Sequence, residues 1–206
     1  MNLLEFIVAR QDLILRLLGE HIRILFFALL FAIVIGVPIG ILVTRLKGIK
    51  KPLMVIINGL QAVPSLALLG LLIPLTGVSE TTAIILIVVY SILPIVKNTN
   101  AGIEGIAPQY IEAANGMGMT KTQLLTKIQL PLAFPIIMAG VRVAAVLGVG
   151  LVTIAAYAGG RGLGYLVYSG INTLDINMIL VGALGAAILA LVIDAILGFV
   201  ERILTR

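Results

Sequence analysis

Between two long apolar runs the chain reads Ala107-Pro108-Gln109-Tyr110-Ile111-Glu112-Ala113-Ala114-Asn115-Gly116-Met117-Gly118. Pro108 suits the first turn of a helix, where its missing N–H is no loss, and Gly118 suits the left-handed backbone position that ends one. Thr120, with Gln123 three residues later, fits a capping box that opens a second helix. We therefore expect two short helices that meet at Gly118.

The first of these helices has the composition of a docking surface. Ala113, Ala114 and Gly116 add little side-chain bulk, so that another protein's backbone can approach closely, and Glu112 supplies a charge that orients the contact. The alternative is a surface or re-entrant helix without a partner. The docking interpretation assigns residues 98–130 to a loop between two membrane spans.

The composition is that of a membrane protein. Of 206 residues, 61% are hydrophobic and 11% are charged, which is far from the average of soluble domains and indicates an all-α protein with several spans. The chain has no Cys and its one His is His21, so neither a disulfide framework nor a paired metal site is expected. We attribute the net charge of +5 to Lys and Arg at the ends of apolar runs, and not to binding of nucleic acid.

Hydropathy predicts five spans after an amphipathic segment. Residues 1–21 mix apolar and charged side chains and are expected to lie along the membrane surface, in front of one transmembrane domain of residues 22–206. The expected spans are residues 24–44, 52–79 and 81–96, then about 136–156, after Pro131 and Pro135, and about 177–200. Arg45, Lys50 and Lys51 follow the first span and, by the positive-inside rule, place this loop, the docking stretch and the carboxy terminus in the cytoplasm and the amino terminus outside.

Polar residues and a proline interrupt the second span, so we expect a broken or strongly tilted helix there. Irregular backbone at membrane depth is tolerated where it faces protein or a water-filled cavity. Gln61, Pro64 and Ser65 are therefore candidates for a solute path, together with Asn98 after the third span. The alternative is a proline kink in which Gln61 and Ser65 bond to neighbouring helices.

Two further spans each contain a charged residue, Arg142 in the fourth and Asp194 in the fifth. Ionisable groups inside a membrane usually face the bundle interior and form pairs. Because the two spans run in opposite directions, both charges can lie at a similar depth, and we expect an ion pair. The alternative is that each side chain reaches separately for the membrane surface.

A glycine-rich run, Gly159-Gly160-Arg161-Gly162-Leu163-Gly164, connects these spans on the predicted outer side. It lacks the terminal Lys and Ser or Thr of a phosphate-binding loop. We expect a flexible outer gate, or a surface in which Gly160, Arg161 and Gly162 meet an extracellular partner. No catalytic motif is recognised, so the chain is not expected to be an enzyme, and a nucleotide that drives transport must be bound by another subunit.

The docking stretch resembles the coupling loop, called the EAA loop, of permease subunits in ATP-binding-cassette (ABC) importers. The resemblance rests on Glu112-Ala113-Ala114, on Gly118 six positions after the glutamate, and on Ile128, Leu130 and Pro131. It implies a type I importer permease fold in which this loop lies in a cleft of an ATPase subunit and carries its motion into the membrane. It also implies that the chain itself binds no cofactor, and that ATP and Mg are bound by the partner ATPase.

Three other segments resemble the permeases of osmoprotectant importers for glycine betaine, carnitine and choline. They are Gln61-Ala62-Val63-Pro64-Ser65-Leu66-Ala67, Leu93-Pro94-Ile95-Val96-Lys97-Asn98-Thr99 and Gly162-Leu163-Gly164. This likeness implies a protein of a bacterial or archaeal cell membrane, surrounded by lipid. It also implies that the chain works together with a second permease subunit, identical or closely related, with ATPase subunits, and with an extracellular substrate-binding protein.

The substrate itself is less well determined by the sequence. A quaternary ammonium is usually selected by an aromatic cage, and a chain with no Trp and 5% aromatic residues argues that selectivity resides mainly in the binding protein. Other small zwitterions, ergothioneine or methionine-type amino acids, are alternatives. A channel or assembly scaffold whose docking helix meets a partner other than an ATPase is an alternative of another class.

Overall fold

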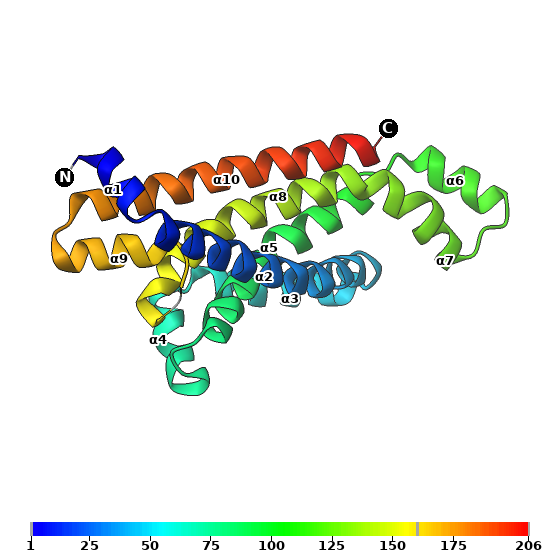
Figure 1. Cartoon of the computed structure of the whole chain (residues 1–206). Coiled ribbons are helices and arrows are strands. Elements are labelled where there is room, and N and C mark those ends of the chain that lie inside the picture. The colour runs from blue at the N-terminus through cyan, green and yellow to red at the C-terminus, as the bar shows by residue number, and fades with distance from the viewer. Residues whose placement is uncertain (1, 160, 206) are drawn as a thin grey trace.

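The computed structural model describes residues 2–159 and 161–205, which form helices joined by short turns (Figure 1). The elements, in chain order, are α1 (Leu3–Ala9), α2 (Gln11–Arg45), α3 (Lys47–Ala62), α4 (Ser65–Thr76), α5 (Glu80–Glu104), α6 (Pro108–Gly116), α7 (Lys121–Leu124), η1 (Leu125–Gln129), α8 (Leu130–Ala155), η2 (Ala156–Ala158), α9 (Gly164–Thr173) and α10 (Ile176–Leu204).

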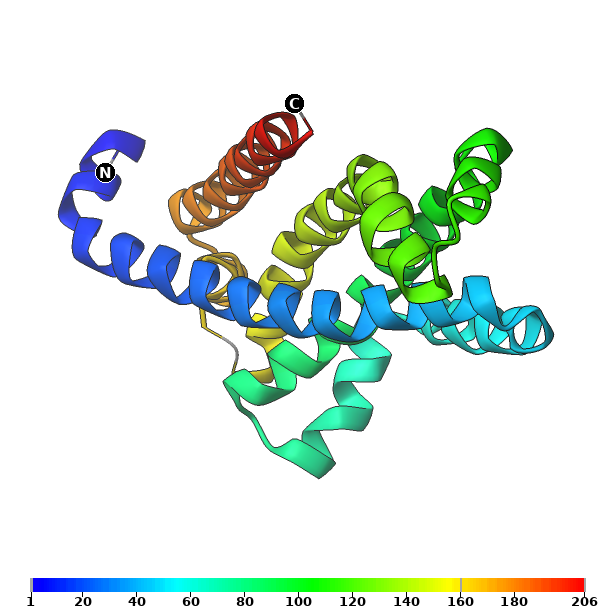
Figure 2. The same cartoon turned by 90° about the vertical axis from the view of Figure 1, so that its right-hand side faces the viewer.

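The long helices α2, α5, α8 and α10 form a bundle, and the shorter elements lie mainly at its two ends (Figures 1 and 2). We call the end where α6, α7 and the carboxy terminus lie the docking end, and the end where α1 and α9 lie the amino-terminal end. Within the described ranges, four helices are long and apolar enough to cross a membrane, or five spans result if the bent pair α3 and α4 is one span. The all-helical fold with about five spans agrees with the sequence prediction.

Small residues let α2 approach α5 closely. Gly36 and Gly40 are buried in α2 and face Ile95 and Thr99 of α5, and a Cβ added to Gly40 would lie 2.5 Å from the Cβ of Thr99. A step of two glycines four residues apart is a common means of close helix packing in membranes. Pro38 lies inside α2, which remains one helix.

The amphipathic segment at the start differs from the predicted single element over residues 1–21. A capping box of Asn2 and Glu5 opens α1, which ends at Ala9, and the residues from Gln11 onward belong to α2. Phe6 and Leu17 are buried in one apolar cluster with residues of α9 and α10. The second half of this segment is therefore held against protein by its apolar stripe and continues into the first long helix.

The second span is broken, as the sequence predicts, and one further boundary differs from the predicted one. The second span breaks at Val63 and Pro64, and the helices on either side are bent by 93°. The fourth span does not start after Pro135, because the helical segment is continuous from Lys121 to Ala158. A π turn at Leu125–Gln129, in which the N–H of Leu130 donates to the carbonyl of Leu125, carries the helix past Pro131, which has no N–H to donate.

Candidate functional site

The docking loop, predicted over residues 98–130, spans residues 105–129, because α5 continues to Glu104 and α8 begins at Leu130. It contains the short helix α6. Pro108 occupies its first turn, as predicted. Its end is a Schellman motif: the N–H of Met119 donates to the carbonyl of Ala114 (3.1 Å) and that of Gly118 donates to the carbonyl of Asn115 (2.9 Å). Gly118 has φ 73°, which confirms the predicted left-handed position. Glycine is favoured there because it adopts positive φ without steric cost.

The second half of the docking loop is an extension of α8. The hydroxyl of Thr120 accepts from the N–H of Gln123 (3.3 Å) and the Gln123 side chain accepts from the N–H of Thr120 (2.8 Å), which confirms the capping box. From Lys121 the helix runs through the π turn into α8 without interruption. A displacement of α7 is therefore a displacement of the end of a membrane-spanning helix.

One face of α6 is open. Glu112 and Ala113 are exposed, Tyr110 is 49% exposed and Met117 is 67% exposed. No described atom outside α6 lies within 4 Å of a Cβ added to Gly116. The face thus combines two large side chains, one carboxylate and two small residues.

The prediction that Ala114 belongs to this open face is wrong. Ala114 is fully buried, and α6 contacts α7 and η1 of its own chain. Its small side chain therefore lets α6 pack against the rest of the docking loop. On an α-helix, neighbouring residues point about 100° apart, so Ala114 can face the rest of the loop while Ala113 faces outward.

The later residues of the predicted docking motif have mixed positions. Ile128 and Leu130 are half-buried and Pro131 is exposed. Leu130 packs with Leu125 against a cluster of Ile103, Ala133 and Ile137. These apolar contacts seat the docking loop on the ends of α5 and α8, so Leu130 serves the internal support of the loop.

Sequence reasoning missed a set of charged residues that holds the docking end together. Lys50 Nζ contacts the two carboxylate oxygens of Glu104 at 2.7 and 2.8 Å, and Asn100 Nδ2 donates to the same carboxylate at 2.8 Å. Arg45 Nη2 donates to the carbonyl of Lys121 at 3.3 Å. The basic loop that indicates orientation in the sequence therefore also joins α2 and α3 to α5 and α7. Glu104, an acidic residue in the predicted cytoplasmic loop, is the signal that could have suggested this.

Gln61 lies at the break between α3 and α4 and bonds to a neighbouring helix. Its Nε2 donates to the carbonyl of Tyr90 in α5 at 2.9 Å. That carbonyl has no donor in its own helix, because the residue four positions later is Pro94. In return the Tyr90 hydroxyl donates to the carbonyl of Val63, at the break itself. We call these two reciprocal bonds the Gln61–Tyr90 clasp.

The other predicted path residues lie near the break or on α5. Pro64 is exposed and precedes α4, and Ser65 is half-buried at its first position. Asn98 donates from Nδ2 to the carbonyl of Pro94 at 2.8 Å. A Cβ added to Gly140 of α8 would lie 2.6 Å from the Cβ of Asn98, so α5 and α8 approach one another closely at Asn98. The clasp accounts for Gln61 by contacts within the protein, while the role of the other three in a path stays a prediction.

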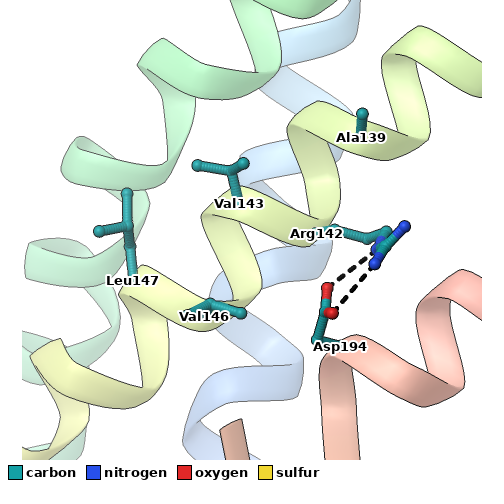
Figure 3. Close-up of a pocket in the computed structure, with 6 residues that line it drawn as sticks. All are labelled: Ala139, Arg142, Val143, Val146, Leu147 and Asp194. Carbon is teal, nitrogen blue, oxygen red and sulfur yellow. Dashed lines mark hydrogen bonds and ion pairs between the residues drawn. The ribbon is translucent and has the colours of Figure 1, made fainter. Parts of the chain in front are cut away.

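Arg142 and Asp194 lie opposite one another on α8 and α10 (Figure 3). Arg142 donates through Nε and Nη2 to the two carboxylate oxygens of Asp194, at 2.9 Å in each case. Arg142 also donates through Nη1 to Glu201 at 3.1 Å. The sequence argument names the first pair but misses Glu201, although it lies one heptad after Asp194 and hence on the same face of α10.

The glycine-rich run at the amino-terminal end is packed tightly. The N–H of Leu163 donates to Nδ1 of the buried His21 at 3.3 Å, and Gly162, at φ 91°, lies against the same histidine. Arg161 is 3.8 Å from Glu20. Gly160 lies outside the described residues. These contacts fix the segment against α2, which differs from the predicted flexible gate.

Comparison with known proteins identifies the class of this molecule. The family model described as "Binding-protein-dependent transport system inner membrane component" matches residues 17–206. The chain belongs to this family of ABC importer permeases. As a permease it is a multi-pass membrane component without catalytic activity or cofactor, and the family implies a complex with an ATPase subunit, which handles ATP, and a binding protein.

Curated relatives match the permease over nearly its whole length. It is 38% identical over 204 residues to the choline transport system permease protein OpuBB of Bacillus subtilis (strain 168), a match that covers 99% of this chain and 94% of the relative. It is 36% identical to the osmoprotectant import permease protein OsmW of Salmonella typhimurium, covering 100% and 98% of the two chains. A third relative is the glycine betaine/carnitine/choline transport system permease protein OpuCB of Bacillus subtilis, 39% identical over 91% of this chain and 86% of the relative.

Solved structures confirm the fold. A structure of the MetNI methionine ABC transporter in an inward-facing conformation matches with a TM-score of 0.87 at 23% identity, covering 96% of this chain and 99% of that one. An amino acid ABC transporter matches with a TM-score of 0.77 at 19% identity over 98% of each chain. At these identities the likeness concerns the permease fold.

Proposed function

We propose that this chain is the permease subunit of an ATP-driven importer for a small quaternary-ammonium osmoprotectant such as glycine betaine, carnitine or choline. The observation that carries the proposal is its identity of 36 to 39%, over nearly full length, to permeases whose names specify these solutes or osmoprotectants. The segments around Gln61, Asn98 and Gly162 support the same branch.

The open face of α6 is the proposed contact with the ATPase. Glu112, Ala113 and Met117 lie on it, and Gly118 fixes the turn that carries α6. Because the helix from Lys121 to Ala158 is continuous, a movement of the ATPase against α6 and α7 is delivered to α8. From there it reaches α5 at the Asn98 and Gly140 contact and α10 at Arg142. The continuous helix from Lys121 to Ala158 includes Ile128, Leu130 and Pro131 near its start.

This mechanism requires a defined orientation and further subunits. We infer that the docking end and the carboxy terminus face the cytoplasm, that the amino terminus lies outside, and that α1 rests on the membrane surface. The basic loop of Arg45, Lys50 and Lys51 at the docking end supports the orientation. A second permease subunit, identical or closely related, completes the solute path, and an extracellular binding protein delivers the solute at the amino-terminal end, where Arg161 is exposed.

Two measurements test the proposed function. The solute-binding protein that serves this permease is titrated with glycine betaine, carnitine, choline, ergothioneine and methionine, and the complete complex in proteoliposomes is assayed for ATP-dependent uptake of the same solutes. Binding and uptake of at least one of the first three are expected. Affinity for ergothioneine or methionine alone would reject the quaternary-ammonium osmoprotectants as the substrate class. Passage of solute without the ATPase would reject the importer hypothesis in favour of a channel.

A further inference from the structure

The cluster around Arg142 carries more negative than positive charge. Arg142 binds Asp194 through two hydrogen bonds and Glu201 through a third. Gly198 lies between these carboxylates on α10, and a Cβ there would be 3.2 Å from the Cζ of Arg142, so the missing side chain makes room for the guanidinium. The three ionised side chains leave one negative charge in excess.

Two members of this cluster, Arg142 and Asp194, line a groove beside α8 (Figure 3). The groove has a volume of about 470 Å³ and is lined by Ala139, Arg142, Val143, Val146, Leu147 and Asp194. Val143 is 49% exposed, and the side chain of Asp194 is 40% exposed. One of its walls is therefore apolar, while another presents the Asp194 carboxylate paired with the Arg142 guanidinium.

The groove lies within the membrane-spanning helices, toward the docking end. At a rise of 1.5 Å per residue, Arg142 and Asp194 each lie six residues, about 9 Å, inside the docking-side limits of the predicted spans 136–156 and 177–200. Ionisable groups at this depth face protein or a water-filled cavity, because hydrocarbon does not solvate them. An accessible carboxylate here is consistent with a position beside the path of a charged solute.

We propose that this groove is a solute contact site that binds a quaternary ammonium group between the Asp194 carboxylate and the apolar wall of Val143, Val146 and Leu147. The assignment of the ligand class rests on the proposed function. A quaternary ammonium has no N–H and needs opposite charge and apolar contact, whereas a primary ammonium needs several hydrogen-bond acceptors. The carboxylates here already accept from Arg142, so they supply charge more readily than free acceptor positions. Among the described lining residues none is aromatic, so the excess negative charge of the cluster, which Glu201 adds through its bond to Arg142, takes the place of an aromatic cage.

The absence of cysteine from the chain allows a direct test. Val143→Cys is introduced into the complete complex in nanodiscs, and its rates of modification by a trimethylammonium-bearing and by a sulfonate-bearing methanethiosulfonate are compared. We expect the ratio of cationic to anionic rates to exceed that of the control Asn172→Cys, and 10 to 100 mM tetramethylammonium or glycine betaine (about the range of a weak site) to slow the cationic reaction. A ratio equal to that of the control, no protection, or no reaction because another subunit or lipid covers the groove would overturn the proposal.

Two charge variants separate this role from a structural one. Glu201→Gln removes the excess negative charge and leaves the Arg142–Asp194 pair, so the ratio of cationic to anionic rates is expected to fall about threefold to tenfold. Arg142→Gln adds excess negative charge, so the ratio is expected to rise. If the cluster only holds α8 to α10, Glu201→Gln leaves the ratio unchanged, which would contradict the site. Asn172→Cys, exposed at the amino-terminal end, is the matched control whose ratio stays constant in both backgrounds.

The test of the groove by cysteine modification does not depend on which solute the complete transporter imports. The ratio of reagent rates tests the site with probes alone, and uptake of glycine betaine, carnitine and choline tests the proposed function. A cation preference without uptake of these solutes would reject the substrate class and retain the site, whereas uptake without a cation preference would reject the site alone.

Discussion

The glycines at the two ends of the bundle have different surroundings. At the docking end, a Cβ added to Gly116 or Gly118 would lie more than 4 Å from every described atom beyond the adjoining backbone. At the amino-terminal end, a Cβ added to Gly164 would lie 2.6 Å from the Cα of Thr153. Gly162 likewise packs against His21. One loop uses glycine to turn the chain and leave a helix face open, and the other uses it to close a gap between helices. The contrast separates residues needed for a partner from residues needed for the fold.

The largest expected effect comes from Gly164→Ala. The new methyl group would collide with the backbone of Thr153, which cannot move as a side chain can, so we expect a loss of about 3 kcal/mol or more and little folded protein. Gly116→Ala, which meets open space, is the matched control and is expected to leave the thermal unfolding midpoint of the detergent-solubilised permease unchanged. Equal unfolding midpoints for the two variants would contradict the inferred difference between the two ends of the bundle.

The Gln61–Tyr90 clasp extends the comparison into the bundle. Gln61→Leu leaves the carbonyl of Tyr90, which Pro94 deprives of a helical donor, without its partner, and we expect a loss of about 1 to 3 kcal/mol. Thermal unfolding of the solubilised permease measures it. Gln61→Glu is the companion variant: it keeps the length of the side chain but replaces the donor by an acceptor, and stability equal to the wild type would show that the bond to Tyr90 contributes nothing.

Gly118→Ala tests the open loop. Its methyl group meets no neighbour, but φ 73° strains any residue with a Cβ by roughly 1 kcal/mol, so the helix end should loosen while the bundle stays folded. We expect more ATP hydrolysed per solute imported in proteoliposomes. Gly118→Asn, which tolerates the left-handed region better, should retain most of the coupling. A normal ratio in the alanine variant would show that the turn does not matter for transmission.

The smallest effect is expected at the docking end's surface ion pair. Lys50 and Glu104 side chains are 37% and 44% exposed, so Lys50→Gln should change the free energy of unfolding by less than about 1 kcal/mol. The loss should diminish further at high salt, which screens exposed charges. A larger change, measured by denaturant unfolding, would mean that this contact supports the docking loop as firmly as packing supports the opposite end.

The sequence predicted the docking loop well because its signals are local. The cap at Thr120, the proline at the start of α6 and the left-handed glycine each depend on a few neighbouring residues. The pairing of Arg142 with Asp194 was also accessible, because an unpaired charge in a membrane is costly.

What the sequence could not supply depends on tertiary contacts. The burial of Ala114 follows from the side of α6 that meets α7, and the Gln61–Tyr90 clasp joins residues that are distant along the chain. The π turn that merges the docking loop with α8 replaces the predicted start of the span after Pro135, because a helix can pass a proline when the preceding turn shifts its hydrogen bonds. The tight seat of Gly162 on His21 likewise requires knowledge of which helices meet.

The proposal that the open face of α6 contacts the ATPase is tested most directly by labelling the variant Met117→Cys. Met117 is 67% exposed, and the chain has no native cysteine. A membrane-impermeant maleimide is applied to inside-out and right-side-out vesicles containing the permease, with and without its ATPase. We predict labelling from the cytoplasmic side and protection when the ATPase is bound. Labelling from the outer side, or labelling that the ATPase does not reduce, would contradict the account.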